Sequence, residues 1–355
     1  MNANVGVSAG DVESAGAPGI RVAVVTLVSG ARLDRARAQW AALDAAGAGD
    51  AAVYAVWLDV DAPPADLVEP AELTEAADLM EPADLVEPAE LAAAPDARPA
   101  TSPATMGRRA TVLHVPPGHD GLRLAAGRNA GAAAAIADGA DLLVFLDADC
   151  IAGRDLFARY FAASLDHPDA VLCGPVTYLP EGFDYTGPAG LAAATAPHPA
   201  RPAPPAGETV VAGELDYRLF WSLSFAVTAY TWQRTGAFFE GYEGYGGEDT
   251  DFGSTLAERG IPLVWVGGAH AYHQYHPTSS PPWQHLDDIL RNAELYFRRW
   301  GRWPMEGWLS AFAEAGAISW REGRWVRSPA ALQASAATAP APAPRARDRR
   351  PPTRR

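Results

Sequence analysis

The chain has 355 residues, 48% of them hydrophobic, and its 28 basic and 43 acidic residues give a net charge of −15. This length suffices for a substantial core, and the acidic balance excludes nonspecific nucleic-acid binding by the body of the protein. No apolar run reaches the length of a transmembrane segment, the first residues do not resemble a secretory signal, and two cysteines cannot form a disulfide framework, so we expect a cytoplasmic protein.

The predicted elements alternate between strand and helix along most of the chain. This alternation predicts an α/β fold with a mostly parallel central sheet, right-handed crossovers and flanking helices. The expected elements are strands at 21–28, 52–58, 111–115, 142–146, 170–173 and 262–266, and helices at 33–43, 121–138, 153–165, 252–259 and 283–300. Gly301 is the expected C-cap of the last helix.

Three segments do not fit this pattern and are expected to be disordered. They are the polar N-terminus 1–19, an insert at 62–108 and a tail at 327–355 rich in Pro, Ala and Arg. The insert repeats a hexad in which Leu recurs every six residues and an acid every three, a period that fits neither helix nor strand. The rest, 20–326, is predicted to form one catalytic domain. The arginines of the tail allow peripheral contact with anionic lipid, although a solvated tail is the simpler interpretation.

Two carboxylates follow the most apolar run of the chain. The run 142–146 predicts a strand buried on both faces, and Asp147 and Asp149 come directly after it. If the strand geometry persists, both side chains point the same way at the sheet edge where open α/β folds bind ligands. Oxygen ligands there suit Mg²⁺ or Mn²⁺ and, through the ion, a diphosphate. A solvated turn is the alternative.

A second motif, Arg128–Gly131, precedes this strand. We expect it to lie toward the start of the helix predicted at 121–138, where backbone N–H groups can face an anion, with the positive charge of Arg128 suited to phosphate and Asn129 beside it. A helix start with a surface arginine is the alternative interpretation.

The run Gly246–Gly247–Glu248–Asp249 predicts a tight turn followed by a helix. Glycine permits a positive φ or the close approach of a ligand, and a helix N-terminus favours ionised carboxylates. An ionised carboxylate beside a sugar hydroxyl acts as a general base. Simple N-capping of the helix by acids is the alternative.

Three histidines, His270, His273 and His276, follow the strand predicted at 262–266. A neutral imidazole is a good ligand to complete a divalent site begun by a carboxylate. Steps of three match neither one strand face nor one helix turn, so we expect one of the three to be a ligand. A three-histidine zinc site and a structural histidine are the alternatives.

The order of these motifs resembles that of the inverting GT-A glycosyltransferases of family 2. The matching features are the RNxG-like segment, the FLDAD strand end, the GYGGEDTD run and the later histidine. The GYGGEDTD run is also similar to the WGGEDDD motif of the β-1,4-galactosyltransferases, with Tyr245 in place of the tryptophan. The resemblance covers about residues 21 to 277 and implies a GT-A fold.

The resemblance also implies a role for each motif residue. Asp149 corresponds to the metal-binding carboxylate and Asp147 to the one that contacts the ribose or the metal shell. Asp249 corresponds to the general base and Glu248 to a companion that positions the acceptor. The remaining assignments are His273 as metal ligand with His270 and His276 as runners-up, Thr26 and Asp59 at the nucleobase, Arg128 and Asn129 at the donor, and Tyr245, Gly246 and Gly247 at the acceptor.

The implied reaction is transfer of a sugar, with inversion, from a nucleotide-diphosphate sugar to an acceptor hydroxyl. The resemblance favours a UDP-linked donor and Mn²⁺ or Mg²⁺, and it leaves a glycan, a lipid-linked molecule or a small molecule as acceptor. Other metal-dependent enzymes of nucleotide sugars, a diphosphate-sugar hydrolase or a nucleotidyltransferase, stay open, as does a catalytically silent sugar-binding module. A nicotinamide oxidoreductase fits poorly because no GxGxxG motif follows the first strand.

Overall fold

The computed structural model describes residues 19–65, 67, 74–75, 110–185 and 187–328. Most of the segments expected to be disordered lie outside the described residues. Residues 74–75, inside the insert expected to be disordered, form a short strand, and the expectation is wrong there. The chain divides into two compact units. Unit 1 comprises the chain up to Gly244 together with Glu248–His276, and unit 2 comprises Tyr245–Gly247 and the chain from Pro277 onward. The predicted limits of one catalytic domain at 20–326 remain a prediction.

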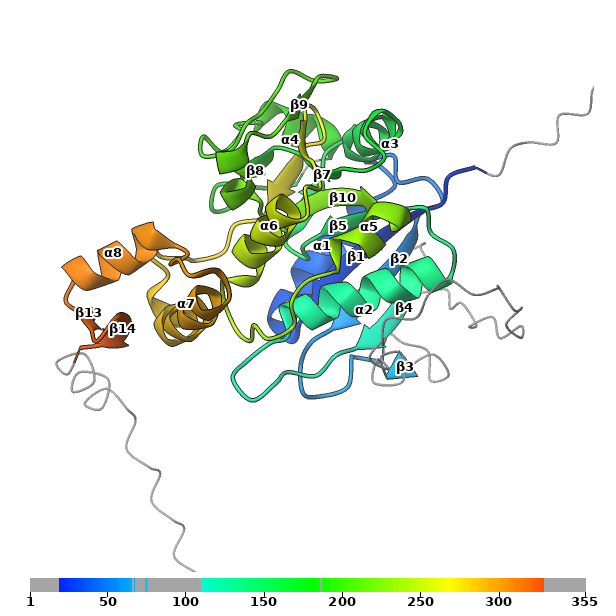
Figure 1. Cartoon of the computed structure of the whole chain (residues 1–355). Helices are drawn as coiled ribbons and strands as arrows, with labels where there is room; N and C mark the ends of the chain where they lie inside the picture. The colour runs from blue at the N-terminus through cyan, green and yellow to red at the C-terminus, as the bar shows by residue number, and fades with distance from the viewer. Residues whose placement is uncertain (1–18, 66, 68–73, 76–109, 186, 329–355) are drawn as a thin grey trace, which may run out of the picture. The chain divides into compact units, whose positions relative to one another are not determined.

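Unit 1 is built on a mostly parallel sheet (Figure 1). Within the described residues its nine strands have the order β3-β4-β2-β1-β5-β10-β7-β11-β9. Strand β10 runs antiparallel to both β5 and β7, and β9 runs antiparallel to β11. The strands are β1 (Val22–Val28), β2 (Ala52–Trp57), β3 (Thr74–Glu75), β4 (Ala110–His114), β5 (Leu142–Leu146), β7 (Val171–Cys173), β9 (Thr209–Val211), β10 (Ser224–Thr228) and β11 (Leu263–Val266).

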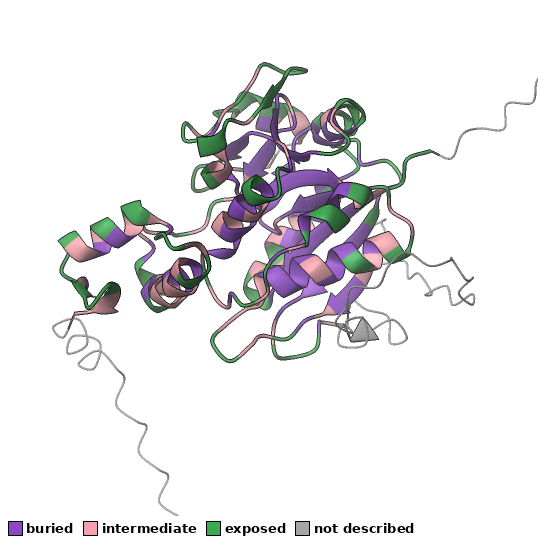
Figure 2. Ribbon diagram, viewed as in Figure 1, coloured by how far each residue is buried: buried purple, intermediate pink, exposed green. Residues whose placement is uncertain are grey.

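Helices cover both faces of this sheet. One core cluster joins α1 and α3 to one face, and a second joins α2, α5 and α6 to the other. Figure 2 shows the strands buried between these layers, which explains why their sequences are apolar on both faces. The helices of unit 1 are α1 (Leu33–Ala42), α2 (Leu124–Ala137), α3 (Leu156–Asp166), α4 (Pro188–Ala193), α5 (Ala229–Thr235) and α6 (Glu248–Glu258), with 3-10 turns η1 (Gly30–Arg32) and η3 (Glu214–Leu219).

A small second sheet lies beyond the carboxyl end of β5. Its strands are β6 (Cys150–Ala152), β8 (Val176–Tyr178) and β12 (Ala271–His273), and β12 pairs with both others. The register sets His273 opposite Cys150. The small sheet therefore brings the segment with the histidines next to the residues that follow β5.

Unit 2 contains helices followed by a β-hairpin. Helices α7 and α8 pack together through a core that includes Ile289 of α7 and Leu309 and Phe312 of α8. Its elements are η4 (Trp283–His285), α7 (Leu286–Trp300), α8 (Glu306–Glu314), β13 (Ile318–Arg321) and β14 (Arg324–Arg327). Helix α7 ends at Gly301, which has a left-handed φ of 67° as expected for a glycine C-cap.

The predicted fold class, a mostly parallel central sheet flanked by helices, is confirmed. Strand 142–146 was predicted to the residue. Residues 180–207, where the sequence predicts no element, contain a short helix, α4, and the expected tail overlaps the last residue of β14. The small sheet, β10 and the hairpin were not predicted. None of the helices in the described part of the chain is both long enough and apolar enough to span a membrane.

Candidate active site

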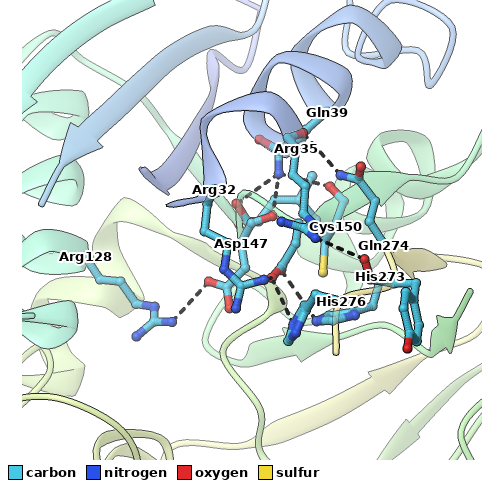
Figure 3. A network of polar contacts seen from close by, with 12 residues as sticks. Arg32, Arg35, Gln39, Arg128, Asp147, Cys150, His273, Gln274 and His276 are labelled. Atoms are coloured by element: carbon cyan, nitrogen blue, oxygen red, sulfur yellow. Dashed lines mark hydrogen bonds and ion pairs between the residues drawn. The ribbon is translucent and has the colours of Figure 1, made fainter. Parts of the chain in front are cut away.

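The two aspartates after β5 lie in a turn, so the strand geometry does not persist and the condition for both side chains to point the same way is not met. The Cys150 N–H donates to the Asp147 carbonyl over 2.8 Å. Gln39, fully buried in α1, fixes this turn by donating its amide to the carbonyls of Asp147 (2.6 Å) and Cys150 (2.9 Å). As a result the two carboxylates face different partners. Asp147 faces Arg128 (Figure 3), and Asp149 faces His273 and His276.

Arg128 joins the two acidic motifs of the sequence. One guanidinium nitrogen lies 3.1 Å from a carboxylate oxygen of Asp147, and the other lies 3.5 Å from a carboxylate oxygen of Glu248. The side chains of Arg128 and Glu248 are only 4% and 8% exposed. The acid after β5 and the acid that begins α6 therefore share one buried cation, although 101 positions separate them in the chain.

The helix that carries Arg128 differs from expectation. Helix α2 begins at Leu124, so Arg128 and Asn129 lie in its second turn and their backbone N–H groups are used within the helix. The prediction of an anion bound by a helix start at this motif is therefore wrong. Gly127 and Gly131 instead let α2 pack closely on the sheet, because a methyl group on Gly131 would lie 2.5 Å from a Val25 methyl carbon.

The clustered acids shift one another's proton affinity. Burial, and next the charge of Asp249, raise the pKa of Glu248 to about 7, against the lowering effect of Arg128. The pKa of Asp147 is also raised, first by burial and then by Asp149 and Asp249, while Arg128 opposes the shift. Burial lowers the pKa of Arg128, but Asp147, Asp249 and Glu248 raise it more, so the guanidinium stays charged.

Asp249 is held by Ser222, which lies just before the start of β10 at Ser224. The Ser222 hydroxyl donates to one carboxylate oxygen over 2.5 Å, and its backbone N–H donates to the other over 3.1 Å. Asp249 is half-buried, in contrast to its buried neighbour Glu248. Two donors on one serine fix the orientation of the carboxylate, which is the requirement for a side chain that removes a proton from a bound hydroxyl.

Asp149 lies in a group that has the donor set of a metal site. Each of its carboxylate oxygens lies 3.6 Å from the Nε2 atom of one histidine, His273 or His276, and the three ligand atoms lie within 4.8 Å of one another. The Arg32 guanidinium lies 2.7 Å from Oδ2 of Asp149, the carboxylate oxygen that His276 also contacts. Figure 3 shows Arg32 and His276. Asp147 does not belong to this group.

One carboxylate and two imidazoles fit a divalent transition metal such as Mn²⁺ better than Mg²⁺, which prefers oxygen ligands. Burial, the largest effect, lowers the pKa of His273, which keeps its ring neutral as a ligand must be. The geometry offers two histidines where the sequence predicted one. His270 faces elsewhere: its Nε2 lies 2.7 Å from the Thr177 hydroxyl, and burial lowers its pKa to about 4, so the three-histidine alternative does not match this arrangement.

The residues predicted at the donor lie in unit 1 with different surroundings. Thr26 is 1% exposed, and its hydroxyl has no hydrogen-bond partner among the described residues. Asp59 accepts the Gly30 N–H over 2.6 Å, which ties the end of β2 to the loop after β1. Both amide hydrogens of Asn129 are used, on the Phe238 carbonyl (2.9 Å) and the Glu240 carboxylate (2.8 Å). Asn129 thus fixes the chain after α5.

The predicted acceptor residues belong to unit 2. Gly246 and Gly247 have φ values of 85° and 101°, so the prediction of a backbone that requires glycine is confirmed. The Asn292 amide donates to the Gly246 carbonyl over 2.7 Å. Tyr245 is 38% exposed and stacks on His285 with ring centroids 4.3 Å apart.

Three side chains of this region carried no motif in the sequence. Ser222 and Arg32 contact Asp249 and Asp149, but only the folded chain brings them together. Arg201, from the Pro-rich loop, is 5% exposed, and its guanidinium lies 5.1 Å from the Trp221 ring and 5.2 Å from the Trp265 ring. Its nitrogens have no hydrogen-bond partner among the described residues. The one available signal applies to Arg32 alone, which lies in the short turn η1 that follows β1.

The comparisons with known proteins found similarity in structure only. No family model matches the sequence, and no curated protein matches it. Among solved structures, TarS 1–349 of S. aureus in complex with UDP-GlcNAc is similar with a TM-score of 0.48 at 11% identity, over 78% of this chain and 66% of that one. Another structure of TarS 1–349 gives 0.46 at 12% identity, and there the chain spans 64% of the length of its relative.

A third similar structure is GalNAc-T7 with UDP, GalNAc and Mn²⁺, with a TM-score of 0.41 at 15% identity over 78% of this chain and 48% of that one. These similarities are distant, since every TM-score is below 0.5.

Proposed function

We propose that the protein is an inverting, metal-dependent GT-A glycosyltransferase that transfers a sugar from a UDP-linked donor to an acceptor hydroxyl. The observation that carries this proposal is the bridge made by Arg128 between Asp147 and Glu248. It joins the acids after β5 to the acids at the start of α6 within unit 1. A donor diphosphate and an acceptor hydroxyl must also lie close together, on either side of one reacting carbon.

In the proposed reaction the acceptor oxygen forms a bond to the anomeric carbon of the donor. The bond from that carbon to the diphosphate oxygen breaks, and its electron pair leaves with the diphosphate. Asp249 accepts the proton of the acceptor hydroxyl, and Ser222 holds the carboxylate in place. Because attack and departure occur on opposite sides of the carbon, the configuration inverts.

Asp149, His273 and His276 are the residues that would hold Mn²⁺. A bound divalent ion supplies electrostatic stabilisation of the charge on the departing diphosphate. The buried charge of Arg128 adds a fixed cation nearby, at Asp147.

Replacement of Asp249 by Asn tests the proposal. The change keeps the shape and the contact with Ser222 but removes the proton acceptor, so transfer should fall by about 10²–10⁴-fold. Binding of the UDP-sugar, measured by calorimetry with Mn²⁺ present, should stay nearly unchanged. Asp169→Asn is the matched control, since this exposed acid precedes β7 at the opposite end of the sheet from Asp147. Wild-type turnover in Asp249→Asn would remove Asp249 from the mechanism.

The same assay separates the alternatives. A diphosphate-sugar hydrolase would release free sugar or sugar phosphate without any acceptor product. A silent sugar-binding module would bind the donor and leave it intact. Neither outcome is compatible with the proposed transfer.

A further inference from the structure

A row of aromatic side chains in unit 1 starts at one of the proposed metal ligands. We define the aromatic strip as Tyr178 at the end of β8, His198 in the segment that follows α4, and Trp221 before β10. The Tyr178 ring stacks on the His273 ring with centroids 4.5 Å apart. The His198 ring lies 5.5 Å from the Tyr178 ring and 5.1 Å from the Trp221 ring, so the three rings form one connected set.

The strip is partly exposed to solvent and is held in place by the residues behind it. Tyr178 is 48% exposed, and His198 and Trp221 are half-buried. The His198 N–H donates to the first carbonyl of β8 over 2.8 Å, which ties its segment to that strand. The buried Arg201 guanidinium lies 5.1 Å from the Trp221 ring and 5.2 Å from the Trp265 ring. A surface that is already ordered loses little entropy when a ligand stacks on it.

The other end of the strip reaches the surroundings of the proposed base. Trp221 directly precedes Ser222, which holds the carboxylate of Asp249. Burial, the largest effect, raises the pKa of the Cys173 thiol to about 12, and the charges of Arg201 and Asp249 shift that pKa in opposite directions. The arginine behind Trp221 and the proposed base therefore both lie near Cys173. The strip thus runs from the proposed metal site to the proposed base.

The strip also lies on one side of β5. In the large sheet β1 and β2 lie on one side of β5, and β10 and β7 lie on the other. Thr26 in β1 and Asp59 after β2 are the residues predicted at the nucleobase, whereas the strip belongs to the segments around β7 and β10. A donor with its nucleobase beside β1 and β2 and its diphosphate at the end of β5 would therefore extend its sugar toward the strip.

We infer that the aromatic strip binds the transferred sugar, a hexopyranose, through one C–H face of its ring. This inference rests on the proposed function and names residues for the sugar, which no motif of the sequence assigns. The negative face of an aromatic ring attracts the partly positive C–H hydrogens of a pyranose. The hydroxyls at the edge of the sugar stay free to bond to water or to polar side chains, so none is buried without a partner.

Calorimetry of the full-length protein with Mn²⁺ separates the contribution of the sugar from that of the rest of the donor. The ligands compared are UDP, UDP-glucose, UDP-galactose and UDP-N-acetylglucosamine. Tyr178→Leu and Trp221→Leu each remove one ring and keep an apolar side chain. In both variants the affinity for the UDP-sugars that the wild type binds should fall roughly two- to tenfold, while the affinity for UDP should not change. Tyr178→Phe keeps the ring and should retain the affinity for UDP-sugars.

The matched control is Tyr230→Leu, which removes an exposed tyrosine ring from α5. This helix follows Thr228, which pairs with Leu142 at the start of β5, so it lies at the opposite end of the strand from Asp147. The control should bind all four ligands like the wild type. Circular dichroism identifies any variant that does not fold, and the exposed position of Tyr178 makes Tyr178→Leu the variant that decides if Trp221→Leu unfolds.

Unchanged UDP-sugar affinity in folded Tyr178→Leu would overturn the inference. So would an equal loss of affinity for UDP and for the UDP-sugars, because it would show a disturbed metal site and no contact with the sugar. A wild type that binds UDP but none of the three UDP-sugars would also overturn it. A wild type that binds neither UDP nor any UDP-sugar would overturn the proposed function itself, and the inference with it.

Discussion

Arg128 illustrates how one buried charge organises its neighbours. A guanidinium without water needs anionic partners, and here it has Asp147 and Glu248. Three acids around one cation leave an excess of negative charge, and the pKa values of both Asp147 and Glu248 are raised, first of all by burial. Glu248 is buried more deeply than Asp147 or Asp249.

The raised pKa of Glu248 has a consequence for stability. Its folded-state pKa of about 7 exceeds the ordinary value of 4.5, so the folded protein binds this proton more tightly than the unfolded chain does. The resulting stabilisation is fully present below about pH 4.5 and is lost as the pH rises through 7. Glu248→Gln does not titrate. Relative to wild type, this variant should therefore gain about 2–3 kcal/mol of unfolding free energy between pH 5 and pH 8.

Urea unfolding of both proteins at the two pH values measures this gain in the absence of metal and donor. Glu258→Gln, an exposed acid at the end of the same helix, is the control. A constant difference between Glu248→Gln and wild type across this range would contradict the assignment of the raised pKa to Glu248.

Arg32 should compete with a metal ion for Asp149, because its guanidinium lies 2.7 Å from the carboxylate. Calorimetry should show Mn²⁺ binding to the wild type and none to Asp149→Ala. Arg32→Gln should bind Mn²⁺ more tightly by up to about fivefold, the range expected for loss of one partly exposed ion pair. Arg37→Gln removes the same charge from the adjoining helix and should not tighten binding. Unchanged Mn²⁺ affinity in Arg32→Gln would show that the ion and the arginine do not share the carboxylate.

At the scale of elements, α2 approaches the sheet through its small residues. Gly127 and Gly131 face Leu27, Val25 and Val56, and the rest of the buried face is mostly alanine. Because α2 lies close to the sheet, the side chain of Arg128, which lies between the two glycines in the sequence, reaches Asp147 and Glu248.

Gly131→Ala should therefore destabilise unit 1. The added methyl group would lie 2.5 Å from a Val25 methyl carbon and 3.1 Å from one of Val56, and overpacking of this kind costs about 1–3 kcal/mol. Gly307→Ala in α8 is the control, since its methyl group meets nothing within 4 Å and should raise helix stability by up to about 1 kcal/mol. Thermal unfolding measures both changes, and a Gly131→Ala variant as stable as wild type would show that α2 can shift.

At the scale of the whole molecule, the residues of the proposed reaction are divided between the two units. Unit 1 contains the acids, the buried arginine and the histidines, while unit 2 contains Tyr245, Gly246 and Gly247, which are predicted at the acceptor.

Much of this protein follows from the sequence alone, because local patterns determine local structure. The apolar run 142–146 predicted a buried strand, and the glycines at 246–247 permitted the positive φ values that the structure has there. The alternation of strands and helices determined the mostly parallel sheet. It also distinguished the acids after β5 and at the start of α6 as candidates for chemistry, since ligands bind beyond the carboxyl ends of the strands in such folds.

Only the tertiary structure decided which of these residues meet. The sequence does not indicate that Arg128 contacts both Asp147 and Glu248, that Ser222 holds Asp249, or that Arg32 and two histidines surround Asp149. Such contacts join residues tens to more than a hundred positions apart, and they depend on the order of strands in the sheet. Packing of α2 against β1, and pairing of β12 with β6, fix them. Long-range packing of this kind leaves no periodicity in the chain.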